Sequence, residues 1–450
     1  MIGSARPMIS RSIRLSAAVF AIAIAPAGAQ QLVATPYSKT GIYRVNEPLG
    51  WSIALAPGQQ AAPGAYTYTI TENGQRTLRT GSLDLADGPA KIETSLSEPG
   101  MVRVEIRPPS GTVNFGAVST GGPGLIALAA AVDPTKIQPD APRPSDFDEF
   151  WKSKLDALAK VPVNAVVTPK ESGADNINYA TFRLDNVGGA HVYGQMAWPK
   201  RAGKFPALVI FQWAAPPYPL PRSWVTDPAA QGWFAVNVEP HDVPSDMPKE
   251  FYDALPQMLK EYQRINDTDR DHNYFLQMYL GDYRAVEFLT SRREWDGRTL
   301  VATGMSMGGQ QSLVTAALNP KVSAVVVHVP AGADAAAALH GRDSGYPFWD
   351  SKNPRVMETA PYFDVVNFAP RIRVPTMVAM GFLDKLAPSI GIWTAFNQIA
   401  GPKEAVPLID AAHNHEATAE QQMGWTIRSA AWLSALLHGE AAPVMPLSAK

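Results

Sequence analysis

The chain has two distinct patterns of hydrophobic and polar positions. Between residues 30 and 120, apolar and polar residues alternate in short runs, as at 51–55, 65–70 and 101–106, and turn-forming residues separate these runs. A period of two is typical of strands with one buried face, and short strands at this spacing are typical of a β-sandwich. We therefore predict a small antiparallel, immunoglobulin-like domain over residues 30–120, followed by a Pro- and Gly-rich linker over residues 121–142.

From residue 143 onward, strand-like and helical segments alternate. A helix is expected at 146–158, with Ser145 as its N-cap and acidic residues in its first turn. Such alternation predicts an α/β fold with helices on both faces of a mostly parallel sheet. We assign this domain to residues 143–438 and a C-terminal tail to residues 439–450. The expected strands lie at 207–213, 233–238, 299–303, 322–329, 376–380 and 405–409, and further helices are expected at 283–291 and 310–318.

The first 29 residues have the composition of an export signal. Three arginines precede a short apolar run, and Ala-Gly-Ala at 27–29 is a small-residue cleavage site. The apolar run is shorter than the roughly 20 residues that a membrane-spanning helix needs, and we expect no integral membrane span. The sequence therefore predicts a signal peptide at 1–29 and a periplasmic or secreted protein.

Composition excludes several classes of function. Of the 450 residues, 46% are hydrophobic and 18% are charged, which is typical of a globular chain rather than a disordered one. The formal net charge of −2 provides no basic excess for neutralising phosphates, so we expect no nucleic-acid partner. The chain has no cysteine, which rules out thiol nucleophiles, disulfides and thiolate metal sites.

One motif indicates the chemistry. Gly-Met-Ser-Met-Gly at 304–308 matches G-x-S-x-G, with a β-rich run before it and a helix-forming run after it. In this context the chain turns sharply from strand to helix, which requires very small flanking residues and exposes the hydroxyl of Ser306 at the edge of the sheet. The backbone N–H of Met307, at the start of the helix, can then donate to an oxyanion.

A serine hydroxyl needs a base that accepts its proton, and the base needs a group that orients it. In the α/β-hydrolase order these partners follow the serine as acid and then histidine. Asp384 comes shortly after the predicted strand 376–380, so its carboxylate is expected at the same edge of the sheet as Ser306. His413 and His415 follow the next predicted strand, and their positions alone do not choose between them.

Several segments resemble the acetyl xylan esterase and cephalosporin C deacetylase family, which is carbohydrate esterase family 7. The resemblance spans roughly residues 140–438 and implies an α/β-hydrolase fold. The segments that carry it are Arg-Pro-Ser-Asp-Phe-Asp-Glu-Phe-Trp at 143–151, Tyr-Phe-Asp-Val-Val-Asn-Phe at 362–368, Gly-Phe-Leu-Asp at 381–384, Ala-Pro-Ser at 387–389, Ala-Gly-Pro-Lys-Glu at 400–404 and Asn-His-Glu at 414–416.

The resemblance implies two further site residues. The family's catalytic histidine is preceded by Asn and followed by Glu, which selects His415 over His413. The family also has a second oxyanion donor in the backbone after the strand 207–213, and the spacing places that N–H at Ala214.

The chain departs from the family pattern at three places. Trp213 and Ala214 stand where the family usually has Gly-Tyr, and Met307 stands where it has Gln, although each change keeps the backbone N–H. The family's Arg-Gly-Gln-Gly segment is replaced by Glu-Pro-His-Asp at 239–242. The predicted N-terminal β-domain is an addition to the single-domain family pattern and would obstruct the ring-like hexamer that members tend to form.

The substrate pocket is expected near these replaced segments. Trp213, Trp224 and Trp349 are candidates for stacking on sugar rings, although core packing is the common role of a single tryptophan. His241 is expected at the entrance of the site. Asp242 is its only neighbour of a residue type that binds metal ions, and two adjacent residues rarely bind one metal ion together.

The predicted reaction is acyl transfer from a small ester, such as an acetylated carbohydrate, to water. His415 accepts the proton of Ser306, Asp384 orients the imidazole, and the N–H groups of Met307 and Ala214 stabilise the oxyanion. This chemistry requires no metal and no organic cofactor.

Two alternatives compete with a small-ester esterase. One is a secreted hydrolase of other specificity, such as a peptidase, because a fold does not determine a substrate. The other is a carbohydrate-binding protein with an inactive hydrolase domain. The expected partner is a small-molecule or oligosaccharide ester, and a homo-oligomer is possible.

Overall fold

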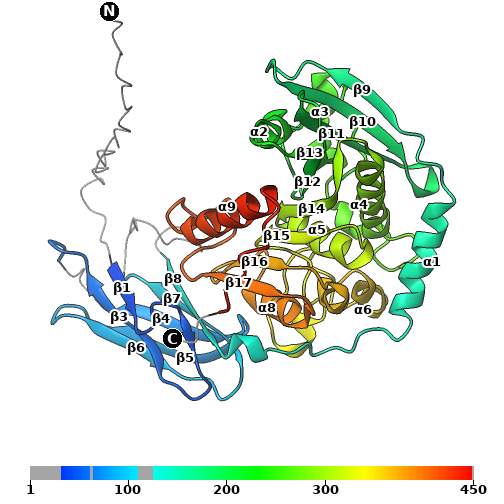
Figure 1. Ribbon diagram of the computed structural model, residues 1–450. Coiled ribbons are helices and arrows are strands. Elements are labelled where there is room, and N and C mark those ends of the chain that lie inside the picture. The colour runs from blue at the N-terminus through cyan, green and yellow to red at the C-terminus, as the bar shows by residue number, and fades with distance from the viewer. Residues whose placement is uncertain (1–31, 61–63, 110–124, 448–450) are drawn as a thin grey trace, which may run out of the picture.

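The computed structural model describes residues 32–60, 64–109 and 125–447. The predicted signal peptide lies outside these residues. The described chain forms an N-terminal β-unit and a larger α/β unit, and the β-unit lies against the part of the α/β unit that contains β16, β17 and α8 (Figure 1). No helix within the described ranges is long and apolar enough to cross a membrane.

The β-unit consists of two sheets around their own hydrophobic core. Alternate side chains of β7 point inward, with Val102, Val104 and Ile106 almost fully buried, as the period of two predicts. The first sheet has the order β1 (Leu32–Pro36), β3 (Leu49–Leu55) and β6 (Ala90–Thr94). The second has the order β2 (Ile42–Tyr43), β8 (Ile126–Val132), β7 (Gly100–Arg107), β4 (Tyr66–Glu72) and β5 (Arg76–Leu83).

The predicted linker at 121–142 is wrong over the segment Ile126–Val132. This segment is strand β8, which pairs with β7 and β2 and is buried along its whole length. Four of its seven residues are alanine, a residue with low strand propensity, and burial between neighbours overrides that propensity. The two sheets agree with a β-sandwich, whereas the immunoglobulin-like assignment stays a prediction.

The α/β unit is built on one nine-stranded mixed sheet. Its strands from β17 to β13 run parallel, while β11, β10 and β9 are antiparallel at one edge. In spatial order the strands are β17 (Lys403–Leu408), β16 (Thr376–Gly381), β15 (Ala324–His328), β14 (Trp295–Met305), β12 (Phe205–Phe211), β13 (Phe234–Val238), β11 (His191–Pro199), β10 (Ile177–Asp185) and β9 (Val166–Lys170). The prediction of a mostly parallel sheet is confirmed, but the antiparallel edge was not foreseen.

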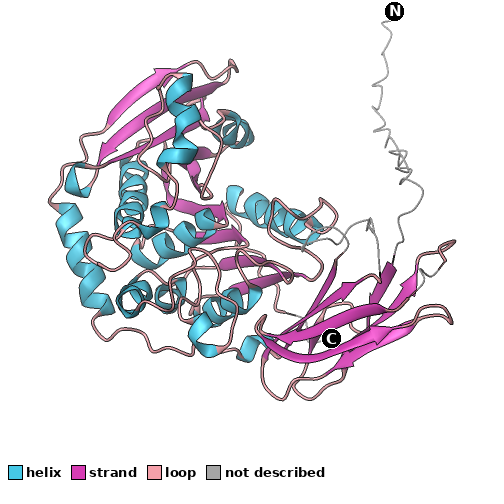
Figure 2. Ribbon diagram, turned by 180° about the vertical axis from the view of Figure 1, so that it is seen from behind, coloured by secondary structure: helices cyan, strands magenta, loops and turns pink. Residues whose placement is uncertain are grey.

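Helices cover both faces of this sheet (Figures 1 and 2). Helices α2 and α9 pack on one face, and α1, α4, α5, α7 and α8 contribute to the large core on the other. The helices are α1 (Phe147–Ala159), α2 (Ser223–Gln231), α3 (Lys249–Met258), α4 (Tyr274–Ser291), α5 (Met307–Leu318), α6 (Pro354–Thr359), α7 (Val365–Phe368), α8 (Ser389–Gln398) and α9 (Met423–Leu437).

Helix α1 forms where the sequence predicts it, but its N-cap differs. The N-cap residue is Asp146 rather than Ser145, and its side chain makes no capping hydrogen bond. Instead, the Asp146 carboxylate accepts hydrogen bonds from Arg270 and Tyr362. Trp151 on the buried face donates from Nε1 to the carbonyl of Tyr362 at 3.0 Å. The partners of Asp146 and Trp151 lie far away in the sequence. Rules for helix caps consider only neighbouring residues, so they could not predict this helix start.

Candidate active site

The motif residue Ser306 lies at the turn between β14 and α5, as the sequence predicts. It has φ of 55° and ψ of −124°, a conformation that costs free energy for a residue with a Cβ. Its N–H donates to the carbonyl of His328 on β15, and its own carbonyl accepts from Gln310 and Ala331. Neighbouring backbone therefore holds the strained residue, and Ser306 remains partly exposed.

The two motif glycines allow close backbone packing at this turn. A Cβ on Gly308 would lie 2.2 Å from the carbonyl oxygen of Phe211, and a Cβ on Gly304 would lie 2.4 Å from the carbonyl carbon of Gly308. Only glycine fits at either position, because real Cβ atoms do not approach backbone so closely. Helix α5 begins at Met307, where the first N–H groups have no acceptor within the helix and can bind an oxyanion.

Asp384 lies in the loop that follows β16 and is held by three hydrogen bonds. Its Oδ1 accepts from the backbone N–H groups of Leu386 and Ala387, both at 2.8 Å. Its Oδ2 accepts from Nδ1 of His413 at 2.7 Å. The side chain of Asp384 is fully buried, and that of His413 is 4% exposed. These donors fix the position of the carboxylate, which in turn holds the imidazole in one orientation.

The prediction of His415 as the partner of Asp384 is wrong. The side chain of His415 is 59% exposed, and its Nε2 lies 3.7 Å from the carboxylate of Glu416. The carbonyl of His413 accepts hydrogen bonds from the N–H groups of Glu416 and Ala417, which forms a tight turn. This turn directs His413 inward and leaves His415 at the surface, where its ring packs edge-on against that of His413 at 5.4 Å.

The loop that carries His413 lies against the turn that carries Ser306. Asn414, the next residue after His413, donates from Nδ2 to the sulfur of Met305 at 3.0 Å. Gln422 in turn donates to the carbonyl of Asn414 at 2.8 Å. The residues adjacent to the serine and to the histidine are thus in contact, which brings three distant segments of the chain to one end of the parallel strands.

Ala214, the predicted second oxyanion donor, follows β12 and is fixed through its carbonyl. His241 bonds to that carbonyl oxygen through Nε2 at 2.9 Å and to the hydroxyl of Tyr274 through Nδ1 at 2.9 Å. A carbonyl can only accept, so Nε2 carries the proton and Nδ1 accepts from the tyrosine. Burial lowers the pKa of His241 to about 4, so its imidazole is neutral at pH 7.

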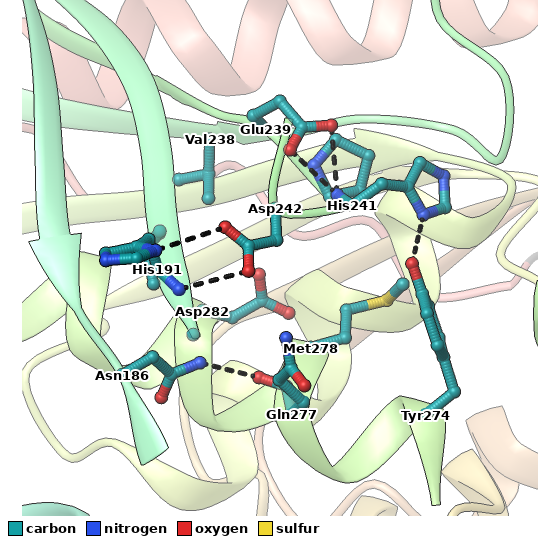
Figure 3. A pocket seen from close by; sticks show the side chains of 13 residues that line it. Asn186, His191, Val238, Glu239, His241, Asp242, Tyr274, Gln277, Met278 and Asp282 are labelled. Carbon is teal, nitrogen blue, oxygen red and sulfur yellow. Dashed lines mark hydrogen bonds and ion pairs between the residues drawn. The ribbon is translucent and has the colours of Figure 1, made fainter. Parts of the chain in front are cut away.

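His241 was expected at the entrance of the site, whereas the structure buries it. It belongs to the segment 239–242, which follows β13. Figure 3 shows the Glu239 carboxylate folded back onto the backbone N–H of His241. Its oxygens also accept from the N–H of Val243 at 2.6 Å and the hydroxyl of Tyr218 at 2.5 Å. Glu239 therefore shapes the loop that presents His241 to Ala214.

The three candidate tryptophans have different environments. Trp213 and Trp224 are partly exposed, and their rings contact each other at 5.2 Å. Nε1 of Trp213 also donates to the carbonyl of Ala215, in the loop that contains Ala214. Trp349 is 8% exposed and packs against Phe275 in the core, so it is not a sugar-stacking residue.

Two cavities lie beside the 239–246 segment. The small cavity in Figure 3 has a volume of about 20 Å³, enough for one water molecule, and Asp242, Tyr274 and Asp282 help to line it. The larger one measures about 630 Å³, within the range of ligand sites. Its lining includes Tyr179, Gln195, Tyr218, Arg222, Asp246 and Tyr252. Across residues 32–60, 64–109 and 125–447, no group of three or more His, Asp or Glu side chains is arranged to hold a metal ion.

Comparison with known proteins identifies the family. The model of the acetyl xylan esterase family, AXE1, matches residues 133–428. The chain is also 30% identical over 370 residues to acetyl esterase Axe7A of Xylanibacter ruminicola, covering 80% of this chain and 81% of that protein. The chain belongs to the acetyl xylan esterase family. The resemblance seen in the sequence is confirmed, and the chain is a serine ester hydrolase.

Solved structures confirm the α/β-hydrolase fold of this family member. Acetyl xylan esterase from Paenibacillus sp. R4 superimposes with a TM-score of 0.55 at 22% identity, covering 66% of this chain and 97% of that one. Acetyl xylan esterase 1 from Thermoanaerobacterium sp. JW/SL YS485 gives a TM-score of 0.53 at 21% identity, covering 65% and 97%.

We predict that Glu239 makes stability depend on pH. Burial raises its pKa to about 7, against the opposing effect of Tyr218 and the backbone N–H groups of Val243 and His241. A raised carboxyl pKa contributes stability below the unfolded pKa, and this contribution is lost as the pH rises through the folded value. A shift from 4.5 to about 7 corresponds to about 3 kcal/mol.

The free energy of unfolding, measured in urea from pH 4.5 to 8, tests this prediction. Relative to a Glu239→Gln variant, whose side chain does not titrate, the unaltered protein becomes less stable by about 3 kcal/mol across this range. Parallel pH profiles for the two proteins would show that Glu239 does not titrate in this window.

Proposed function

We propose that this esterase removes acetyl groups from acetylated carbohydrates, with Ser306 as nucleophile, His413 as general base and Asp384 as the group that orients it. The buried hydrogen bond between Asp384 and His413 carries this proposal, together with the contact of Asn414 with Met305 that holds the histidine loop against the strained turn at Ser306. The AXE1 match and the similarity to Axe7A support an acetyl esterase activity.

In the first half of the reaction, Oγ of Ser306 attacks the ester carbonyl while Nε2 of His413 accepts its proton. Asp384 accepts from Nδ1 of His413, so Nε2 is the basic nitrogen before attack. The carbonyl oxygen becomes an oxyanion, and the tetrahedral intermediate collapses as His413 protonates the leaving alcohol. The acyl group is then bonded to Ser306, and water repeats the cycle and releases the carboxylic acid.

Two backbone N–H groups stabilise the oxyanion. One is that of Met307 at the first position of α5, and the other is that of Ala214 after β12. An oxyanion donor is worth roughly 3 kcal/mol of transition-state stabilisation. His241 contributes indirectly, because its bond to the Ala214 carbonyl fixes the segment that carries the second donor.

The carbohydrate part of the substrate is proposed to extend into the cavity of about 630 Å³. The loop after β12 carries Ala214 near its start and residues 218–222 along the wall of this cavity. Tyrosine rings and hydrogen-bonding side chains such as Arg222 suit a sugar, which has apolar faces and many hydroxyls.

The mature protein is proposed to act outside the cytoplasm, either secreted or in the periplasm. The support is the positively charged start, short apolar run and Ala-Gly-Ala site within residues 1–29.

The two histidines give a matched test of the proposed base. We expect His413→Ala to lower kcat for p-nitrophenyl acetate by at least about 10³-fold, because it removes the base that contacts Asp384. We expect His415→Ala, an equal truncation two residues away, to keep kcat within about twofold. Initial rates of p-nitrophenol release measure both. Loss of activity only in the His415 variant would contradict the proposed triad.

The substrate proposal predicts that one substitution changes KM for a large carbohydrate ester and leaves KM for a small ester unchanged. Arg222→Ala is expected to raise KM for acetylated xylo-oligosaccharides several-fold, because a sugar hydroxyl loses a donor worth about 1 kcal/mol. The KM for p-nitrophenyl acetate should not change, because this ester has no sugar hydroxyl that could accept from Arg222. Acetate release measures the first reaction and p-nitrophenol release the second.

Arg298→Ala is the control, because Arg298 is an exposed arginine at the start of β14, far along the chain from the proposed cavity. Equal changes for the two substrates, or no change for either, would argue against the carbohydrate assignment of this cavity.

A further inference from the structure

We propose that the N-terminal β-unit is a positioning element for Asp384, acting through Arg103 and Glu105 on β7. This inference rests on the proposed function, because it assumes that the bond between Asp384 and His413 orients the catalytic base. It assigns the β-unit a role in the reaction itself.

The contacts fall on the two residues that flank Asp384. Nη1 of Arg103 donates to the carbonyl of Leu383 at 3.1 Å. Nζ of Lys385 donates to Oε1 of Glu105 at 3.1 Å. Arg103 and Glu105 are two positions apart on one strand and therefore point from the same face. The β-unit thus holds the chain immediately before and immediately after the catalytic acid.

The two β7 side chains also support each other. Nε of Arg103 donates to Oε1 of Glu105 at 3.3 Å, and their side chains are 11% and 25% exposed. Although burial opposes the shift, Lys385 and Arg103 together lower the pKa of Glu105, so this carboxylate stays charged. Partial burial and mutual hydrogen bonding make the contacts of Arg103 more rigid than exposed surface ion pairs, whereas Lys385 is 51% exposed and its bond to Glu105 is the weaker of the two attachments.

The carbonyl of Leu383 is an effective point of attachment. It belongs to the same planar peptide unit as the backbone nitrogen of Asp384, so holding this oxygen fixes the start of the acid residue. The N–H of Leu383 donates to the carbonyl of Ala411 at 2.9 Å, two residues before His413. Arg103 therefore contacts the carbonyl of a residue whose own N–H is bonded to the loop of the histidine.

Other contacts seat the β-unit along the same edge. The N–H of Asp343 donates to the carbonyl of Asn73 at 2.8 Å, and Nε2 of Gln75 donates to the carbonyl of Arg342 at 2.5 Å. The carbonyl of Leu386 in the acid loop accepts from the N–H of Tyr346 at 2.7 Å. Figure 1 shows the β-unit beside β16 and β17, whose following loops carry the acid and the histidine. These bonds join the β-unit to the segment 342–346, which is itself bonded to the acid loop.

Catalysis is sensitive to small displacements, and a misplacement of about 1 Å can cost 10²-fold in rate. We expect Arg103→Ala to lower kcat for p-nitrophenyl acetate by about 10- to 100-fold while KM changes by less than about twofold. Arg103→Lys keeps a donor for the Leu383 carbonyl and should restore most of the rate. The matched control is Arg79→Ala, because Arg79 donates to the carbonyl of Glu93 within the β-unit.

Turnover is measured per active site, with the sites titrated by a fluorophosphonate probe. A purely structural role for Arg103 would lower the number of titrated sites or Tm and leave turnover per site unchanged. The proposal requires lower turnover per site for Arg103→Ala, at a site number close to that of Arg79→Ala.

Lys385→Met tests the second contact and leaves the pair of Arg103 and Glu105 in place, whereas Glu105→Gln weakens the bonds of Glu105 to both Lys385 and Arg103. Each substitution is expected to lower turnover per site by about 3- to 10-fold. These two variants also test the inference if Arg103→Ala fails to fold. Unchanged turnover per site in every foldable variant would overturn the inference.

A Ser306→Ala variant separates this inference from the proposed function. If Ser306→Ala is inactive while Arg103→Ala has normal turnover, only the role of the β-unit is wrong. If Ser306→Ala keeps full activity, the proposed function itself is wrong.

Discussion

The hydrogen bond between the buried carboxylate of Asp384 and Nδ1 of His413 is the interaction on which the site depends. It connects two loops that follow neighbouring parallel strands, β16 and β17, and it determines which nitrogen of the imidazole is basic. A buried carboxyl group requires hydrogen-bond donors, and Asp384 receives them from His413 and from the N–H groups of Leu386 and Ala387. The loop geometry around the acid is therefore a condition for the chemistry.

The remaining parts of the site are built by similar backbone constraints. Ser306 is held in a strained conformation because glycine at 304 and 308 lets β14, α5 and the end of β12 come together. Ala214 is held through its carbonyl by His241, and the loop that carries His241 is shaped by the buried carboxylate of Glu239. In this family member, buried polar side chains fix backbone groups on both sides of Ser306, the proposed nucleophile, which favours preorganised electrostatic stabilisation of an oxyanion.

Much of this arrangement could be predicted from the sequence. The strand-to-helix turn at Ser306 and the acid at 384 follow from local motifs and the order of elements. The histidine could not be chosen in this way, because His413 and His415 occupy the same loop and only the turn after residue 413 directs one of them inward. The resemblance favoured His415 through its neighbours Asn414 and Glu416. The alanine-rich strand β8 was also missed, because its pairing partners lie far away in the sequence.

The central claim is that Ser306 is an activated nucleophile. Reaction of the full chain with a fluorophosphonate, followed by mass spectrometry of its peptides, tests this claim directly. We expect one phosphonyl group per chain, bonded to Ser306. An unlabelled chain, or a label on a different serine with Ser306 unmodified, would contradict the account.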